Sequence, residues 1–209
     1  MTFKESLNFR HACKVFDENR KISEAEFAQI LEAGRLSPSS LGLEHWDFWL
    51  VQNPKMREKI QKACWNQVQI PTCSHLLVIF AKISDFKSGG EYVRQMVERR
   101  FDKNSAQHDA YIAKIEDFLV HNVGQSDLEI FAWSKAQCFL CAQNMMSMAA
   151  VLGIDTCPIE GYVESELNKA LELDTSKKRV AMLLPFGYRV NEPKPKVRRN
   201  LDEFLTVFE

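Results

Sequence analysis

The sequence lacks long apolar runs and any excess of one charge. None of its 209 residues belongs to a stretch approaching the ~18 consecutive apolar residues that a membrane-spanning helix needs. Its first residues, Met1 to Glu5, lack the apolar core of a signal peptide. Lysine and arginine number 27 against 28 aspartates and glutamates, which argues against nucleic acid or an anionic membrane as the main partner. We therefore expect a soluble cytoplasmic protein with one domain.

The signatures of several common enzyme sites are absent too. The chain has no Gly-x-Gly-x-x-Gly or P-loop pattern, no Gly-x-Ser-x-Gly elbow and no His-Glu-x-x-His. Its five histidines show no metal-ligand spacing, so we expect no metal site.

Cysteine occurs six times, mostly inside apolar segments. Cys138 and Cys141 form a Cys-x-x-Cys pair, but a zinc ribbon would need a second pair, and a redox pair normally opens a helix. This pair lies well inside a helical pattern. We therefore expect the cysteines to be buried in the core.

Apolar periodicity predicts helices separated by a few strands. Ser23 and Glu26 form a capping box, with Ile22 and Phe27 as a hydrophobic staple, and Pro38 ends the helix that follows. Further helices are predicted over 55–64, 92–97, 111–119, 128–152 and 164–173, strands over 46–51, 76–81 and 180–184, an extended segment over 154–158, and turns at 88–90 and 102–105. This order predicts a layered α/β or α+β domain.

The character of the chain changes after Arg189. Pro193 and Pro195 favour an extended, basic arm, and the last nine residues include five apolar ones. A disordered tail would have little reason to carry so many apolar residues. We therefore divide the chain into a domain, 1–190, and an extended arm, 191–209, that belongs to the same domain and packs against another surface.

Three short segments could carry chemistry. These are Arg10 to Lys14, with two cations four residues apart, the turn Ser37 to Ser40, and the strand-end turn Pro158 to Gly161. Taken separately, each is explained as well by a solvated charge pair or an ordinary turn.

Taken together and in this order, these segments resemble the FMN-dependent nitroreductase family. The resemblance rests on five motifs that span nearly the whole chain: Arg10-His11-Ala12-Cys13-Lys14-Val15-Phe16, Leu36-Ser37-Pro38-Ser39-Ser40 followed by Trp46-x-Phe48, Asn66-Gln67-Val68-Gln69, Gly153-Ile154-Asp155-x-x-Pro158-Ile159-Glu160-Gly161, and Lys196-Val197-Arg198-Arg199.

The resemblance implies a site that holds FMN. Arg10, Lys196 and Arg198 would meet the phosphate. Lys14 would place a positive charge beside N1 and O2 of the flavin, where negative charge gathers on reduction. The Glu160 backbone N–H would point at N5. The other implied cofactor contacts are His11, Ala12, Asn66, Gln69, Pro158, Ile159 and Gly161, together with Pro38, Ser39 and Ser40 from the partner subunit.

The resemblance also implies the fold and the reaction. The fold would be α+β, with a mostly antiparallel central sheet flanked by helices, in an intertwined homodimer whose C-terminal arms exchange. NADH or NADPH would reduce FMN and leave, and a nitroaromatic, quinone or similar small acceptor would then take the electrons in a ping-pong cycle.

The sequence departs from the family's usual pattern at several places. Ala12 offers no hydroxyl to the phosphate, and Gly42 to His45 replaces a more usual Asn-x-Gln-Pro, so Glu44 could alter acceptor or nicotinamide preference. Cys13 beside Lys14 could have a lowered pKa, although a packed core residue is the alternative.

Three other functions remain open at this stage. The chain could be a flavin or quinone reductase with incidental nitro activity, or a non-catalytic flavin-binding sensor dimer. It could also be an interaction protein whose basic segment, Lys194 to Arg199, binds an acidic partner.

Overall fold

The computed structural model describes residues 1–87, 89–103 and 105–208. Its centre is a four-stranded sheet in the order β1 (Trp46–Val51), β2 (His75–Lys82), β4 (Lys178–Gly187) and β3 (Asp155–Thr156). Every neighbouring pair is antiparallel, with Trp46 opposite Ala81 in the first pair and a register shift at Ile79 and Phe80 in the second. The expected antiparallel α+β fold is therefore confirmed.

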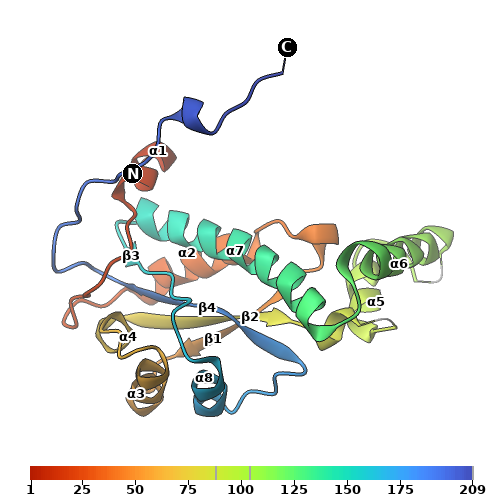
Figure 1. Cartoon of the computed structure of the whole chain (residues 1–209), viewed down its shortest axis with the longest axis horizontal. Coiled ribbons are helices and arrows are strands. Elements are labelled where there is room, and N and C mark those ends of the chain that lie inside the picture. The colour runs from red at the N-terminus through yellow and green to blue at the C-terminus, as the bar shows by residue number, and fades with distance from the viewer. Residues whose placement is uncertain (88, 104, 209) are drawn as a thin grey trace.

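Helices cover both faces of this sheet (Figure 1). α2 (Glu24–Arg35) and the long α7 (Asp127–Val151) pack on one face, and α3 (Pro54–Ala63), α4 (Gln69–Thr72) and α8 (Glu164–Leu171) pack on the other. The two-residue period of β2 separates the two cores. Leu77, Ile79 and Ala81 face α7, whereas Leu76, Val78 and Phe80 belong to the core beneath α3 and α8.

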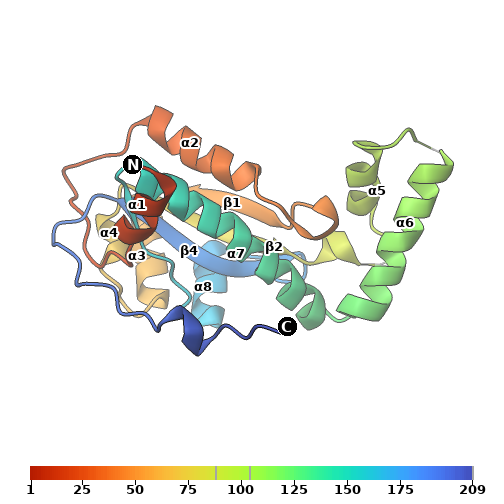
Figure 2. The same ribbon diagram turned by 90° about the horizontal axis from the view of Figure 1, so that it is seen from above.

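A third apolar cluster lies beside the sheet. α5 (Glu91–Glu98), α6 (Ala106–Phe118) and the π-helix Leu119–Val123 form an excursion that projects from one end of the molecule (Figures 1 and 2). It has its own buried side chains, which include Phe86, Val93 and Ile115, and Leu43 from the loop after α2 packs among them.

Several local predictions are confirmed. The Ser23 hydroxyl accepts from the Glu26 N–H at 3.3 Å, the reciprocal bond is present, and Ile22 and Phe27 are buried in one cluster. α7 agrees with the predicted 128–152 to within one residue, and Gly153 follows it at φ +75°. All six cysteines are buried and free.

Other predictions need correction or lie outside the described residues. α8 ends at Leu171 rather than Leu173, because Glu172 takes a left-handed conformation (φ 50°). The short helices α1 (Phe3–Phe9) and α4 were not predicted. Ser88 and Asn104, in the two predicted turns, lie outside the described residues. No helix among the described residues is long and apolar enough to cross a membrane.

The arm after Arg189 lies along the surface of its own chain. Lys196 Nζ donates to the carbonyls of Asn8 and Arg10, beside the end of α1. Beyond this point the chain includes a short 3₁₀ turn, Leu201–Glu203, and runs away from the sheet (Figure 1). The arm's large apolar side chains are exposed, with Phe204 at 60% and Phe208 at 93%.

Candidate functional site

The first and fourth motifs lie side by side. Ala12 forms a parallel bridge with Thr156 of β3, and the Cys13 N–H donates to the Thr156 carbonyl at 3.0 Å. Ile159 exchanges two backbone hydrogen bonds with Leu183 of β4, so the sheet fixes the turn that follows. Residues about 145 positions apart in the sequence therefore share one edge of the sheet.

Three side chains converge beside this edge. Lys14 Nζ and Gln69 Nε2 each lie 3.7 Å from Cys157 Sγ. Gln69 and Cys157 are buried, whereas Lys14 is exposed. Burial raises the pKa of the Cys157 thiol, and the charge of Lys14 opposes this only in part. The thiol is therefore neutral and acts as a weak acceptor for both nitrogens.

The third motif is tied to the fourth by side chains. Gln67 Nε2 donates to the Gly161 carbonyl at 2.8 Å, and Gln69 Nε2 donates to Gln67 Oε1 at 2.8 Å. Asn66 is exposed and takes a left-handed conformation (φ 55°). Gly161 packs on the Trp65 ring so closely that a Cβ there would lie 2.5 Å from a ring carbon. A side chain at this position would therefore have to displace the Trp65 ring, which is 66% exposed.

The two remaining residues of the Pro158–Gly161 turn face solvent. Pro158 and Glu160 are exposed, and the Glu160 carboxylate pairs with Lys135 Nζ of α7 at 2.9 Å. The carboxylate is thus turned towards α7 and has a partner of its own. This arrangement leaves the backbone of the turn, rather than the Glu160 side chain, as the fixed feature of the site.

Positive charges gather at the other end of the site. Partial burial and the charges of Arg10, Arg198 and Arg189 lower the pKa of Lys196. Arg189 pairs with the buried Asp155 at 2.7 Å. A bound anion would relieve the repulsion among the other three cations, Arg10, Lys196 and Arg198. Their arrangement therefore suits a phosphate group.

His11 lies between these charges. Its Nδ1 lies 3.4 Å from Asp155 Oδ1, the oxygen that Arg189 Nη2 approaches at 2.7 Å, and His11 Nδ1 itself makes no hydrogen bond among the described residues. Burial lowers the pKa of His11, and Asp155 opposes this change. Ala12 is exposed and can offer the site only its backbone.

Cys13 does not have the lowered pKa that its neighbour Lys14 suggested. The side chain is 2% exposed, and burial raises the pKa of its thiol to about 11. Its Sγ donates to the Val15 carbonyl at 3.2 Å. Cys13 is therefore a packed core residue.

The second motif lies elsewhere in the single chain. The Ser40 N–H donates to Gln137 Oε1 of α7 at 2.9 Å, and Ser39 Oγ accepts from the Glu44 N–H at 3.0 Å. Pro38 is exposed. In both views this loop lies towards α5, whereas the chain after α1 lies at the opposite end of α7 (Figures 1 and 2).

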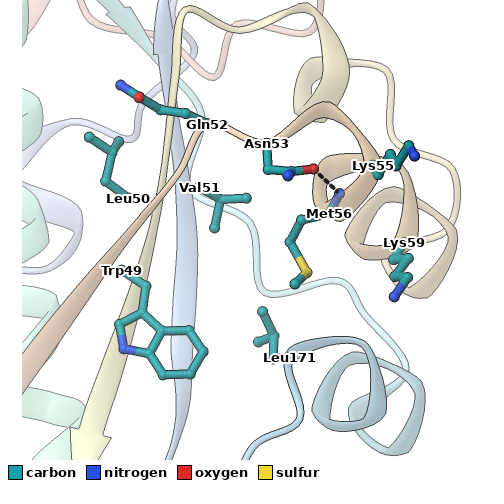
Figure 3. A pocket seen from close by; sticks show the side chains of 9 residues that line it. All are labelled: Trp49, Leu50, Val51, Gln52, Asn53, Lys55, Met56, Lys59 and Leu171. Carbon is teal, nitrogen blue, oxygen red and sulfur yellow. Dashed lines mark hydrogen bonds between the residues drawn. The ribbon is translucent and has the colours of Figure 1, made fainter.

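A well-formed hollow lies away from this site. It has a volume of about 620 Å³ and lies between β1, α3 and α8, with Trp49, Met56 and Leu171 as walls and Lys55 and Lys59 on α3 (Figure 3). The hollow beside Lys14 and Cys13 measures only about 130 Å³. In one chain, the site of the first and fourth motifs is therefore a shallow surface.

Four further residues shape this surface and were not singled out from the sequence. Their contacts join segments that are far apart in the chain, so no local pattern marks them: Trp65, Lys135, Cys157 and Arg189.

Comparisons with known proteins agree with this architecture. The model of the Nitroreductase family matches residues 7–188. The chain is 39% identical to "Putative NAD(P)H nitroreductase YfkO" of Bacillus subtilis (strain 168). The alignment extends over 209 residues and covers 96% of this chain and 95% of that protein.

Two solved structures share the fold. One is described as a "putative NAD(P)H:FMN oxidoreductase" from Staphylococcus epidermidis ATCC 12228, with a TM-score of 0.84 and 25% identity over 99% of this chain and 95% of that one. The other is a "putative nitroreductase in complex with FMN" from Exiguobacterium sibiricum 255-15, with a TM-score of 0.84 and 24% identity over 100% and 98% of the two chains.

Proposed function

Because the chain belongs to the nitroreductase family, we propose that it is an FMN-dependent oxidoreductase that uses NAD(P)H to reduce nitroaromatics, quinones or similar small acceptors. The observation that carries this proposal is the convergence of Lys14, Gln69 and Cys157 at one end of a surface whose other end gathers Arg10, Lys196 and Arg198. When bound, FMN would take a hydride from NAD(P)H and pass electrons to the acceptor.

The cationic end fits the phosphate of FMN. Lys196 keeps the arm against Arg10 by donating to its carbonyl, and both side chains then carry positive charge towards the same space. A flavin phosphate near −2 would relieve their repulsion and accept charge-assisted hydrogen bonds from them. The same contact ties the basic arm to its own domain, which favours a cofactor-binding role over capture of an acidic protein.

The opposite end fits the flavin ring. Lys14 would hold a fixed positive charge beside the pyrimidine edge, and the Gln69 amide and Asn66 would offer donors and acceptors there. The Pro158–Gly161 turn would lie against the ring with the Glu160 N–H directed to N5. Glu160 would act through its backbone, since its carboxylate pairs with Lys135.

A second copy of the chain would complete each site. The Pro38–Ser40 loop is remote from Lys14 within one chain, so it would reach the FMN of the partner. Domain 1–190 and arm 191–209 would remain one unit, with Lys196 held on its own chain and the apolar residues beyond it packed on the other subunit. Support comes from the exposed apolar side chains of the arm, each of which gains about 1.5–3 kcal/mol from full burial.

The edge of the sheet offers a surface for this arm. β3 at one end of the sheet is bridged by Ala12. β1 at the other end, next to the hollow in Figure 3, has no strand on its outer side among the described residues. Trp49, Met56 and Leu171 would receive apolar side chains of the arm. Lys55 and Lys59 complement its acidic residues, Asp202 and Glu203.

Anaerobic stopped-flow spectroscopy tests the proposed reaction. NADH or NADPH should bleach the 450-nm region of protein reconstituted with FMN, and a nitroaromatic or a quinone should then restore the colour within one turnover. A flavin that binds but is not bleached by either nicotinamide would favour the sensor instead. Bleaching followed by reoxidation with quinones or free flavin alone would favour the flavin or quinone reductase.

A further inference from the structure

The loop from Pro38 to His45, called here the 38–45 loop, has an unusual backbone. Leu41, Gly42 and Glu44 take left-handed conformations, with φ of 55°, 65° and 48°. Such conformations cost free energy in residues other than glycine, so surrounding contacts must hold them. This loop also contains the Gly42–His45 departure from the family's usual pattern.

Helix α5 and the two residues that follow it supply those contacts. The Tyr92 hydroxyl lies 2.9 Å from the Leu43 carbonyl and 3.1 Å from the Glu44 carbonyl, so its one hydrogen serves both. Arg99 Nη1 pairs with Glu44 Oε1 at 3.2 Å, and Arg100 donates to the carbonyls of Leu41 and Gly42. The arginine contacts are exposed and therefore contribute little each.

Tyr92 is the best placed of the three. Its ring packs edge-on against Phe86 at 5.7 Å, and Lys82 Nζ lies 4.6 Å from the ring centre. Burial raises the pKa of Tyr92 to about 12, so the hydroxyl remains protonated and can donate across the physiological range.

Hydrogen bonds within the 38–45 loop connect Tyr92 to Ser39 and Ser40, the residues that would contact the cofactor. Glu44, whose carbonyl Tyr92 holds, donates its N–H to Ser39 Oγ at 3.0 Å. The buried His45 imidazole lies 3.2 Å from the Ser40 carbonyl through Nε2. A change at Tyr92 therefore reaches Ser39 through one residue.

We propose that Tyr92 is a positioning residue that fixes Ser39 and Ser40 for the FMN of the partner subunit and so couples the α5–α6 excursion to cofactor retention. The inference rests on the proposed function, because Ser39 and Ser40 matter here only if they meet FMN. Binding of an acceptor or nicotinamide that displaces α5 would then weaken the contacts between the 38–45 loop and the flavin, and FMN would dissociate faster.

Tyr92→Phe tests this inference, since it removes the hydroxyl and keeps the ring. Tyr111→Phe is the matched control, because Tyr111 packs its ring on Phe101 in the same excursion. FMN dissociation should be about five- to tenfold faster in Tyr92→Phe, as expected for the loss of one partly buried hydrogen bond, and should change less than twofold in Tyr111→Phe. The visible circular dichroism of bound FMN should change only in the first variant.

A double-mutant cycle separates positioning from general destabilisation. Ser39→Ala should speed FMN dissociation in the wild-type background and have a clearly smaller effect in Tyr92→Phe, because both changes break one path. This coupling can be measured even if Tyr92→Phe lowers the Tm. If the effects of the two substitutions on FMN dissociation were additive, or if Tyr92→Phe left the dissociation rate unchanged, the inference would be overturned. FMN binding by the wild-type protein would still support the proposed function in that case. Wild-type protein that binds no FMN would overturn both.

Discussion

Replacing both Lys196 and Arg198 with alanine should weaken FMN binding through the phosphate alone. A charge-assisted hydrogen bond contributes about 1.5–3 kcal/mol, so two independent bonds would contribute about twice that. Lys196 is exposed and already donates to the carbonyls of Asn8 and Arg10, which offsets part of its contribution. We therefore expect a loss of about 2–3 kcal/mol, or about 30- to 150-fold in Kd.

Fluorescence titration of the apoprotein with FMN and with riboflavin measures this effect. Riboflavin lacks the phosphate, so its Kd should change less than twofold in the double variant. Lys194→Ala is the control, because it removes a cation from the same arm, two residues before Lys196. Equal losses for FMN and riboflavin, or an unchanged FMN Kd, would refute the assignment of the phosphate to these cations.

Four further changes should affect the flavin, turnover, dimerisation and stability. Lys14→Met should lower the reduction potential of bound FMN by the equivalent of about 1–3 kcal/mol, measured by dye equilibration, and an unchanged potential would contradict its role. Glu160→Gln should keep substantial turnover, because the carboxylate pairs with Lys135, and complete loss of turnover with FMN bound would instead make the carboxylate catalytic. Deleting the chain after Arg189 should weaken FMN binding and dimerisation together, as size-exclusion chromatography with flavin quantification would show. A truncated chain that elutes as a dimer with its full FMN content would contradict the role of the arm in both. Burial lowers the pKa of His45 in the folded chain to about 4. As pH falls below 6.5, His45 therefore becomes protonated in the unfolded chain while it stays neutral in the folded chain. Urea unfolding should therefore show about 2 kcal/mol lost between pH 7 and pH 5 from this group, a loss that His45→Asn should not share.

Local patterns predicted the elements whose stability is local. The capping box at Ser23 satisfies orphan N–H groups within one turn of helix, and α7 is a long, mainly apolar helical segment whose buried residues run from Ile130 to Ala150, so both can be recognised without tertiary context. α4 has only four residues, includes Pro71 and carries no such signal. The position of α4 depends instead on its packing in the core between the sheet and helices α3 and α8.

The candidate site divides in the same way. The motif residues could be listed from the sequence, yet their grouping depends on the Ala12–Thr156 bridge, which joins segments 144 residues apart. Cys157 was passed over because a cysteine before a proline has no chemical signature until Lys14 and Gln69 are seen to meet it. Cys13 was assigned a possible reactivity from its neighbour in sequence, and burial decides against it.

Native mass spectrometry of the purified protein, with the released flavin identified, tests the central claim most directly. The account predicts a particle of two chains and two FMN molecules, whose flavin is bleached anaerobically by NADH or NADPH. A colourless protein that cannot be reconstituted with FMN would contradict it.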